Sequence, residues 1–562
     1  MTKDIDTGEI WYRERHSEER TSSIIIPHCK IVTFNGIGYD IPILRLAMAG
    51  ASNVILKAAS DDIIQHDFKP WDIDHKYGGV ELSYIDHIDI MNVAPGKGSL
   101  KAYGGRLNSK KLQDLPIDPS AMISPEQRTQ LKKYCENDLD TTIDLYRKLK
   151  PQIDLREKMS QEYDIDLRSK SDAQIAEAVI KKQLGGNVYR PEISPGYQVF
   201  YRPPEWVKFA SEGLNKILSV ITESPISLND KGGVVMPKIF ESMVITIGKM
   251  KYRLGVGGIH SCEKLIMHHG PLKDVDVTSY YPSIILNQGL YPAHLGPDFL
   301  NVYRKIVNRR LEAKSTGDTA TAESLKIVIN GSFGKFGNKW SILYSPNLLI
   351  QTTVTGQLAI LMLIEILEGF GVEVVSANTD GVVFKPNNIT SIIVQAWENI
   401  TGFQTEETNY RALYSKDVNN YIAVKDHGGV KAKGLYATGG LSKNPTNTVC
   451  VEAVIAKLLW GVNIDEWIRD CRDFTKFLTC RKVTGGATHR GEYLGKNIRW
   501  YYAYGHEDSA INSVVNGKLV PKSQGAKPVM DIPDDFPDDI NYKWYEFEAR
   551  NILEDIAYDK TT

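Results

Sequence analysis

Cysteine is scarce in this sequence. Its 562 residues include only six, at Cys29, Cys135, Cys262, Cys450, Cys471 and Cys480. None forms a CxxC pair, so neither a structural zinc site nor a disulfide framework is expected. The sequence therefore indicates a reducing, cytoplasmic compartment.

Long apolar segments are also missing. No apolar run reaches the length of a membrane span, and the first residues, MTKDIDTGEIWYRER, lack the apolar core of a signal peptide. We therefore expect no membrane partner. Hydrophobic residues make up 42% and charged residues 24%, which is typical of a soluble globular protein. A chain of 562 residues is too long for one core, which predicts two or more domains.

The chain has no large excess of charge of one sign. Its formal net charge is −2, whereas many nucleic-acid-binding proteins are strongly basic. Positive charge is nevertheless concentrated locally, because segment 301–339 contains eight Lys or Arg and only three Asp or Glu. Taken alone, such a segment is more often a solvated helix face than a binding site.

The N-terminal segment alternates strand and helix patterns. KIVTF, from Lys30 to Phe34, predicts a buried strand that runs into the Asn35-Gly36 turn and an apolar helix. A second strand is expected near 84–91. Ser124 and Pro125 are typical of the cap and first position of a helix, which we expect to reach about Leu149. This alternation predicts an α/β domain over 1–150.

Two acidic residues follow or interrupt β-branched runs. Asp276 lies in KDVDVT, and Pro282 five residues after the last Val of that run favours a strand, a tight turn and then a helix. Asp380 lies in GVEVVSANTDGVVF, where the Asp-Gly pair favours a hairpin turn. Taken singly, each aspartate is more simply explained as a structural turn residue than as a ligand.

The two aspartates gain a function only if the fold joins them across 104 residues, from 276 to 380. Two carboxylates about 4 Å apart repel each other by about 4 kcal/mol at an effective dielectric constant near 20. Magnesium removes this cost and is bound by one or two carboxylates plus substrate phosphates. Two ions about 3.5–4 Å apart then activate the attacking oxygen and stabilise the leaving oxygen.

A basic helical hairpin is predicted between the two aspartates. Residues 301–314 favour a helix, 315–318 break it, and a second helix is expected from 319 to about 329. Arg310 and Lys314 share a helix face at i,i+4 spacing, and the turn brings Lys326 to a similar height. Three cations on facing helices predict a clamp for a triphosphate.

The second helix is followed by small residues around one aromatic side chain. Asn330 shares the face of Lys326, and GSFG at 331–334 allows a flat base to approach Phe333. The alternative for the whole segment is an exposed amphipathic hairpin. The acidic residues on either side of it favour the phosphate-binding interpretation.

Four motifs in this order resemble those of family B DNA polymerases, and most closely the compact bacteriophage members. DVTSYYPS at 276–283 is similar to motif A, DxxSLYPS, and KIVINGSFG at 326–334 is similar to motif B, KxxxNSxYG. NTDG at 378–381 resembles motif C, DTDS, with Asn378 in place of the first aspartate. KAKG at 431–434 resembles the KxKG element. The resemblance extends over about 30–562.

The resemblance implies an α/β and α+β multidomain fold, with an RNase H-like exonuclease domain followed by a right-hand polymerase of palm, fingers and thumb. The implied domains are an exonuclease-type domain (1–150), a connecting region with the first part of the palm (151–300), the fingers hairpin (301–338), the remaining palm (339–440), and the thumb with a C-terminal wrap (441–562).

The resemblance also implies a role for each matching residue. Asp276 and Asp380 would hold two Mg²⁺ ions, for which Mn²⁺ can substitute, with the Val277 carbonyl as a further ligand. Lys326 would join the two aspartates as a catalytic residue, and Tyr281 would be the steric gate against a ribose 2′-hydroxyl. The implied nucleotide-binding residues are Ser279, Tyr280, Tyr281, Arg310, Lys314, Asn330, Phe333 and Gly334. The implied primer-template residues are Tyr421, Lys431, Lys433 and Gly434.

Two further matches lie in the N-terminal domain. NGIGYD, from Asn35 to Asp40, resembles the exonuclease motif NxxxFD, and Tyr134 and Asp138 fit YxxxD on one helix face. The alternative is an Asn-Gly turn and a surface helix. The family's upstream DxE strand has no counterpart, because DIDT at 4–7 is preceded by only three residues. We therefore predict that 3′–5′ proofreading is impaired.

The predicted function is DNA-directed DNA synthesis from a nucleic-acid primer in phage-type replication, within the host cytoplasm if the protein is viral. Motifs A and B are 50 residues apart (276 to 326) and motifs B and C are 54 apart (326 to 380), which leaves no room for protein-priming subdomains. The expected partners are primer-template DNA, deoxynucleoside triphosphates and, where one exists, a processivity factor. The alternatives are a catalytically silent primer-template DNA-binding protein, a nuclease, and a primase-polymerase.

Overall fold

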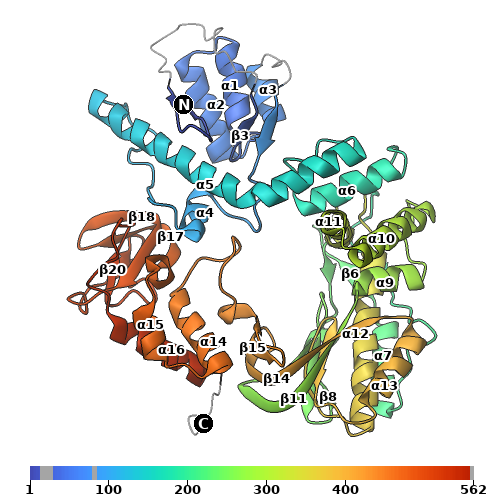
Figure 1. Cartoon of the computed structure of the whole chain (residues 1–562). Coiled ribbons are helices and arrows are strands. Elements are labelled where there is room, and N and C mark those ends of the chain that lie inside the picture. Colours follow the sequence, from blue (N-terminus) through green and yellow to red (C-terminus); the bar gives the residue numbers. More distant parts are fainter. Residues whose placement is uncertain (13–28, 79–84, 557–562) are drawn as a thin grey trace. The chain divides into compact units, whose positions relative to one another are not determined.

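The computed structural model describes residues 1–12, 29–78 and 85–556, and Figure 1 shows its helices and strands. The chain divides into two compact units, each described here by itself. The first comprises Met1–Ser171, Gly439–Val449 and Cys471–Tyr545, and the second comprises Asp172–Thr438, Cys450–Asp470 and Glu546–Thr562. Mixed α/β structure in more than one domain is what the sequence predicts. This division places residues 151–171 in the first unit and shares residues 441–562 between both, and the predicted domain boundaries stay a prediction.

The N-terminal part of the first unit contains little sheet. β3 and β4 form a parallel pair in which Val32 lies opposite Ile88. The predicted strand at Lys30 to Phe34 is therefore present, but it is half-buried instead of buried. The elements are β1 (Thr2–Lys3), β2 (Ile10–Trp11), β3 (Ile31–Thr33), α1 (Asp40–Met48), α2 (Asn53–His66), α3 (Pro70–Tyr77), β4 (His87–Asp89) and α4 (Leu100–Leu107). Of the second predicted strand, near 84–91, residue 84 lies outside the described residues.

α5 (Pro125–Tyr163) begins where the sequence predicts and ends later. The Ser124 side chain accepts a hydrogen bond from the Gln127 N–H, and the Gln127 side chain accepts one from the Ser124 N–H, which forms a capping box. The expected end near Leu149 is wrong. Leu149 and Ile153 are both buried at i,i+4 spacing, so packing of this face continues the helix through Pro151 despite the hydrogen bond that proline removes.

A second sheet completes the first unit. Its four strands are antiparallel, in the order β19-β17-β18-β20. The fully buried Arg499 of β18 donates hydrogen bonds to the carbonyls of Ser109 and Val529, which satisfies its charge inside the unit. The elements are η2 (Phe474–Phe477), β17 (Thr479–His489), β18 (Glu492–Tyr502), β19 (Ile511–Ser513), β20 (Ala526–Pro528) and α16 (Tyr542–Asp555), whose end belongs to the second unit.

The second unit is built on a nine-stranded antiparallel sheet, in the order β16-β15-β14-β11-β13-β12-β10-β9-β8. The strands are β8 (Ile245–Ile247), β9 (Met250–Leu254), β10 (Ile259–Ser261), β11 (Ile266–Val277), β12 (Val374–Asn378), β13 (Gly381–Phe384), β14 (Thr405–Asp417), β15 (Asn420–Lys425) and β16 (Val430–Ala432). The two predicted acidic motifs therefore lie on β11 and on the β12–β13 hairpin, which are neighbours in the sheet.

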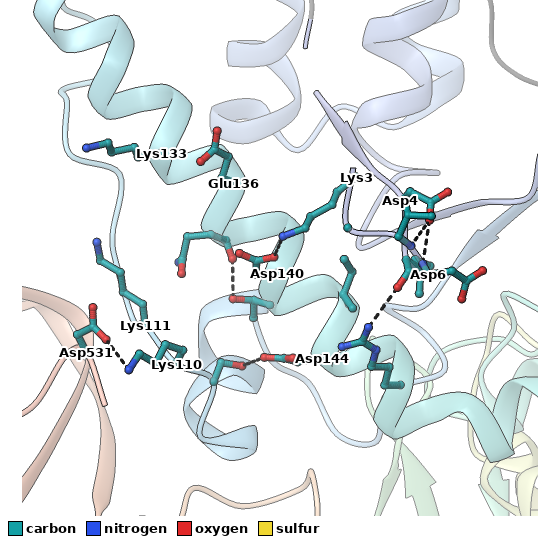
Figure 2. A pocket seen from close by; sticks show the side chains of 18 residues that line it. Lys3, Asp4, Asp6, Lys110, Lys111, Lys133, Glu136, Asp140, Asp144 and Asp531 are labelled. Atoms are coloured by element: carbon teal, nitrogen blue, oxygen red, sulfur yellow. Dashed lines mark hydrogen bonds and ion pairs between the residues drawn. The ribbon is translucent and has the colours of Figure 1, made fainter. Parts of the chain in front are cut away.

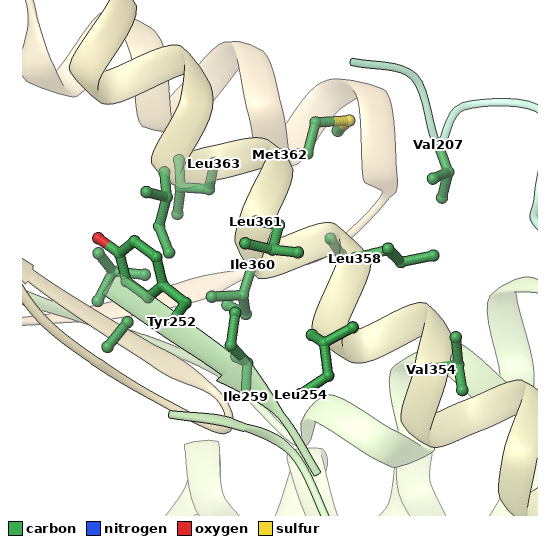
Figure 3. Packing of buried hydrophobic residues seen from close by; sticks show 14 of the residues in the cluster. Val207, Tyr252, Leu254, Ile259, Val354, Leu358, Ile360, Leu361, Met362 and Leu363 are labelled. Atoms are coloured by element: carbon green, nitrogen blue, oxygen red, sulfur yellow. The ribbon is translucent and has the colours of Figure 1, made fainter. Parts of the chain in front are cut away.

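α12 (Pro346–Gly369) forms the core of the second unit against one face of this sheet (Figure 3). Leu358, Leu361 and Leu363 are fully buried, in one cluster with Ile259 and Tyr252 of the sheet. α12 is long and apolar enough to cross a membrane, so the expectation that no run reaches that length is wrong. However, 83% of its apolar window is buried inside the structure, which is the position of a core helix.

The predicted basic hairpin is present as α10 (Asp298–Thr316) and α11 (Thr319–Phe336). The Asp318 side chain caps α11 by accepting a hydrogen bond from the Thr321 N–H. The expected end near Ile329 is wrong, because α6 packs against α11 and the helix continues through the GSFG segment. The other elements of this unit are α6 (Asp172–Gln183), β5 (Gln198–Val199), α7 (Glu212–Glu223), β6 (Ile226–Leu228), β7 (Val234–Val235), α8 (Lys238–Ser242), α9 (Tyr280–Asn287), α13 (Thr390–Thr401), η1 (Gly434–Tyr436), α14 (Thr448–Trp460) and α15 (Ile464–Asp470).

Candidate functional site

Strand alternation decides which side chains of β11 reach the site. Val275 and Val277 point into the α12 core, whereas Asp274 and Asp276 point to the opposite face of the sheet. Asp276 lies opposite Gly381 of β13 on one side and opposite Glu406 of β14 on the other. The chain leaves the strand through Ser279, which has a left-handed backbone (φ 49°), and enters α9. Asp276 is thus held at the end of a central strand.

The β12–β13 hairpin brings Asp380 beside Asp276. The turn includes Thr379 with φ 45°, and the Val277 N–H donates a 2.8 Å hydrogen bond to the Asp380 carbonyl. Gly381 follows the turn and lies against the Asp276 side chain. A Cβ atom on Gly381 would lie 2.1 Å from Asp276 Oδ1, so any other residue there would force the Asp276 carboxylate to move. The fold therefore joins the two aspartates that the sequence separates by 104 residues.

Both aspartates line a cavity of about 470 Å³ on the open face of the sheet. The other polar side chains that line it include Asp274, Asn378, Tyr410, Tyr421, Lys431 and Lys433. Burial, and next the charge of Asp274, raise the pKa of Asp276 to about 6. Burial also raises the pKa of Asp380. The cavity thus concentrates carboxylates whose charged forms need a cation.

Lys431 supplies one such cation from the edge strand β16. Its ammonium lies 2.9 Å from Asp274 Oδ2 and 3.3 Å from Asp276 Oδ2. Burial alone would lower the pKa of Lys431, but the carboxylates of Asp274 and Asp276 raise it above its ordinary value. The resemblance implies a primer contact for Lys431, whereas in the structure its ammonium lies on the carboxylates. Sequence reasoning did not single out Asp274, although the DVD spacing places it on the same strand face as Asp276.

The aspartate pair offers oxygen ligands of the kind that Mg²⁺ prefers. Both carboxylates are hard oxygen donors. Burial raises both of their pKa values, because it disfavours the charged form, and a divalent ion would offset that cost. Within the described residues, no group of three or more His, Cys, Asp and Glu side chains is arranged to hold a metal. Two carboxylates are nevertheless sufficient for Mg²⁺ that shares its coordination with water and substrate phosphates.

Two adjacent tyrosines of α9 have different surroundings. Tyr281 stacks on Phe333 of α11, with ring centroids 4.2 Å apart and planes 12° apart, and its hydroxyl donates to the Gly257 carbonyl. Tyr280 is buried, and its hydroxyl donates to the Gly356 carbonyl of α12. Tyr281 and Phe333 are thus joined across two helices, while Tyr280 is a core residue in this structure.

The three predicted phosphate-binding cations make different contacts. Arg310 Nη1 donates a 3.0 Å hydrogen bond to Ser279 Oγ, at the turn that follows Asp276. Lys314 pairs with Glu406, the residue opposite Asp276 in β14, at 2.6 Å. Lys326 pairs instead with its helix neighbour Glu323 at 3.2 Å. Asn330 and Gly334 are exposed on α11, next to Phe333 in the sequence.

Two lysines of the KxKG element, Lys431 and Lys433, line the same cavity. The Lys433 N–H donates a 2.9 Å hydrogen bond to the Tyr421 carbonyl of β15. Gly434 has φ 63°, and a Cβ atom there would lie 2.1 Å from Asn420 Oδ1. The Leu435 N–H donates to the same Asn420 oxygen, so this glycine closes a tight turn. Tyr421, Lys431 and Lys433 therefore line one cavity with the aspartates.

The residues of the first exonuclease match surround a buried carboxylate. Asn35 has a left-handed backbone (φ 68°), and its N–H and that of Ile37 donate to the Asp89 carboxylate at 2.9 and 3.0 Å. Burial, and next the charge of Asp89, raise the pKa of Asp40. Sequence reasoning missed Asp89, which closes the Asn-Gly turn by accepting backbone hydrogen bonds. The strand pattern around it, HIDIM, was the only available signal.

Both residues of the second exonuclease match, Tyr134 and Asp138, are in contact with a lysine side chain. Lys101 of α4 forms an ion pair with Asp138, and its Nζ lies 4.2 Å from the centre of the Tyr134 ring. Within the described part of the chain, no hydrogen bond or ion pair connects Asp40 with Asp138. Residues 4–7 form the turn between β1 and β2, in which the Asp4 side chain accepts the N–H groups of Asp6 and Thr7. As predicted, they do not form a central strand.

A second cavity, of about 780 Å³, lies between the N-terminal turn and α5 (Figure 2). Its charged side chains largely satisfy each other or nearby backbone. Lys3 pairs with Asp140, Arg147 donates to the Ile5 carbonyl, and Lys110 lies 3.9 Å from Asp531. The mutual neutralisation of these groups makes this cavity a weaker candidate than the aspartate cavity.

Comparison with known proteins gives structural similarities only. No family model and no curated protein matches the chain. Among solved structures, the chain is similar to the family B DNA polymerase from the hyperthermophilic archaeon Pyrobaculum calidifontis. The TM-score is 0.42 and the identity 14%, over 94% of this chain and 70% of that chain.

Proposed function

We propose that this chain is a DNA-directed DNA polymerase of the family B type that extends a nucleic-acid primer by two-metal nucleotidyl transfer. The observation that carries the proposal is that Asp276, at the end of β11, and Asp380, in the β12–β13 turn, line one cavity. Arg310 is hydrogen-bonded to the turn that follows Asp276. In this proposal the nine-stranded sheet is the palm, α10 and α11 are the fingers, and the N-terminal segment is a reduced exonuclease-type domain.

Asp276 and Asp380, with the Val277 carbonyl, would hold Mg²⁺, and Mn²⁺ has the same preference for oxygen ligands. When bound, two such ions activate the primer 3′-hydroxyl and neutralise charge on the leaving pyrophosphate. The carboxylates themselves would orient the acceptor end of the primer at the end of the central strand β11 and the β12–β13 turn. Their partial burial keeps this charge in an environment of low dielectric, where it acts more strongly than in water.

The helical hairpin would bind the triphosphate of the incoming nucleotide. Arg310 is held at the Ser279 turn by one guanidinium nitrogen, and its buried Nε has no hydrogen-bond partner among the described residues. A phosphate oxygen would satisfy this donor with charge-assisted geometry. Lys314 and Lys326 would exchange their exposed pairs with Glu406 and Glu323 for phosphate, which costs little because exposed ion pairs are weak.

Tyr281 would limit the space for the sugar, and Phe333 would meet the base. The hydrogen bond to Gly257 holds the Tyr281 ring in place, so a 2′-hydroxyl would clash with a ring that cannot easily move. Because Phe333 stacks on this ring, an incoming nucleotide would have to separate the two rings. Lys433, Gly434 and Tyr421 would follow the primer strand along the cavity floor.

The proposed setting is phage-type DNA replication in the host cytoplasm, with primer-template DNA and deoxynucleoside triphosphates as partners. A processivity factor fits this setting as an accessory partner. Most of the affinity for DNA would come from phosphate contacts and would weaken steeply as salt is raised.

The test is extension of a labelled primer-template with Mg²⁺ and deoxynucleotides. The wild-type protein should extend the primer, and Asp380→Asn should abolish extension while circular dichroism and duplex affinity stay unchanged. Asp426→Asn, in an exposed turn of the same unit, is the matched control and should extend normally. Absence of extension by the wild-type protein, with retained primer-template binding, would instead support the silent DNA-binding alternative.

Two observations favour that second candidate function. The Lys431 ammonium lies 3.3 Å from Asp276 Oδ2, where a metal ion is expected. Asn378 stands where the resembled motif has an aspartate, so the hairpin has one negative charge less. A protein that binds primer-template DNA without catalysis would keep this arrangement permanently. The two candidates differ in whether a divalent ion can enter the cavity.

A further inference from the structure

Lys431 makes an asymmetric contact with its two carboxylates. The shorter distance, 2.9 Å, is to Asp274, whose side chain is only 5% exposed. The longer distance, 3.3 Å, is to Asp276, whose side chain is 44% exposed. Asp274 is therefore the enclosed partner of the ammonium, and Asp276 is the partner that faces the cavity.

Asp274 is anchored independently of Lys431. The hydroxyl of the buried Tyr410, on the adjacent strand β14, donates a 2.5 Å hydrogen bond to Asp274 Oδ2. The same oxygen accepts the hydrogen bond from Lys431. An enclosed carboxylate without a cation is strongly unfavourable, so Lys431 and Asp274 should remain together when the cavity fills.

A divalent ion and the Lys431 ammonium compete for the same oxygen. The Lys431 ammonium now lies 3.3 Å from Asp276 Oδ2. A divalent ion bound by Asp276 and Asp380 would lie close to this ammonium and repel it. The ammonium can move away from Asp276 without losing Asp274, because that side chain is fixed by Tyr410. Asp274 would thus remain as a partner for the lysine charge once Asp276 held a metal ion.

We propose that Lys431 is an internal counter-ion of the carboxylate cavity, anchored by Asp274, and that a divalent cation binds by displacing its ammonium from Asp276. This inference rests on the proposed polymerase function, for which it identifies Asp274 as a positioning residue. It replaces the primer contact that the motif resemblance assigns to Lys431. Lys433, which makes no ion pair among the described residues, is the better placed of the two lysines for the primer.

The test measures binding of Mn²⁺ alone, without DNA or nucleotide, by the electron paramagnetic resonance signal of the free ion. Asp380→Asn defines the sites outside the cavity, and Lys425→Met is a control on the adjacent strand β15. Lys431→Met should bind Mn²⁺ about fivefold more tightly than wild type, the factor that corresponds to about 1 kcal/mol. Lys425→Met should match wild type.

Asp274→Asn should weaken Mn²⁺ binding several-fold, because Lys431 would then have only Asp276 as a partner. Adding Lys431→Met to Asp274→Asn should restore affinity to at least the wild-type value. A double variant as weak as Asp274→Asn would show that Asp274 acts directly as a ligand. If Asp274→Asn does not fold, the comparison of Lys431→Met with wild type still decides the proposal.

Each failure has a distinct signature. Equal Mn²⁺ affinity in wild type and Lys431→Met, with weaker primer-template binding by the variant, would overturn this inference and restore the primer role. Mn²⁺ binding that is the same in wild type, Lys431→Met and Asp380→Asn would instead show that no ion binds in the cavity. That result would contradict the proposed function, which depends on this metal site. Binding of Mn²⁺ by Lys431→Met alone would show that the ammonium blocks the ion in the wild type, which would overturn the displacement step.

Discussion

Tyr281 is stacked between Tyr280 and Phe333, with ring centroids 5.9 and 4.2 Å away and interplanar angles of 17° and 12°. The two neighbours come from different elements, because Tyr280 precedes it in α9 and Phe333 lies on α11. The α10–α11 hairpin therefore contacts α9 through the Tyr281 ring, in addition to the hydrogen bond from Arg310 to Ser279. A nucleotide that enters this space has to replace the contact with Phe333, which is the less buried of the two neighbours.

This arrangement predicts the sugar selectivity of the site. Tyr281→Ala would remove the ring that a 2′-hydroxyl is expected to meet, while leaving Asp276 and Asp380 in place. We expect the preference for deoxynucleotides over ribonucleotides, measured as the ratio of kcat/KM values, to fall at least about tenfold, or about 1.4 kcal/mol. Tyr291→Ala, in the loop after α9, is the control and should keep the wild-type ratio. An unchanged ratio in Tyr281→Ala would contradict the role of this ring.

The close approach at Gly381 gives a prediction about the carboxylate pair. In Gly381→Ala the new Cβ would lie 2.1 Å from Asp276 Oδ1, so the Asp276 side chain would have to turn away. Primer extension should fall by about 100-fold or more, since a displacement of about 1 Å at a reacting centre has this effect. Gly213→Ala on α7 has open space around the new methyl group and should extend normally. A wild-type rate of primer extension in Gly381→Ala would show that the reaction does not depend on the position of the Asp276 carboxylate.

Proofreading is predicted to be weak or absent in the chain alone. Asp138 is paired with Lys101, and residues 4–7 form a turn where the exonuclease motif requires a central strand. A labelled primer with a 3′ mismatch should therefore remain intact with Mg²⁺ and no nucleotides. Asp40→Ala and Asp138→Ala should behave like wild type in this assay. Rapid shortening of the primer by wild type, lost in Asp138→Ala, would refute the prediction.

Glu263 predicts a pH dependence of stability. Burial raises the pKa of its carboxyl above the ordinary value of 4.5, although Ser376 donates a 2.6 Å hydrogen bond to it. Between the two pKa values the unfolded chain is ionised and the folded chain is protonated, so unfolding releases a proton. The contribution of Glu263 to the free energy of unfolding therefore decreases as pH rises from about 4.5 through the folded-state pKa, and is then constant.

Glu263→Gln should lack this pH dependence. Urea unfolding of wild type and Glu263→Gln at intervals from pH 5 to 8 should give a difference in stability that changes in favour of the variant as pH rises. Glu192→Gln, at an exposed position, serves as the control and should follow wild type at every pH. Parallel curves for wild type and Glu263→Gln would show that Glu263 has the same pKa in the folded and unfolded chains.

Local chemistry determined several elements of this protein directly. The Ser124-Pro125 start of α5, the hairpin around Asp380 and the strand, turn and helix at Asp276 depend on residues within about four positions of each other. Their capping hydrogen bonds and restricted backbone angles exist whatever surrounds them, so the sequence was sufficient to predict them.

Only the tertiary structure decided how these elements meet and where the helices end. α5 continues through Pro151 and α11 through Gly334 because buried faces pack against other elements, and this packing outweighs local preference. The ion pair between Lys431 and Asp274 joins residues 157 positions apart by strand order. No local pattern contains that order, because the free energy that selects it comes from the burial of the whole sheet against α12.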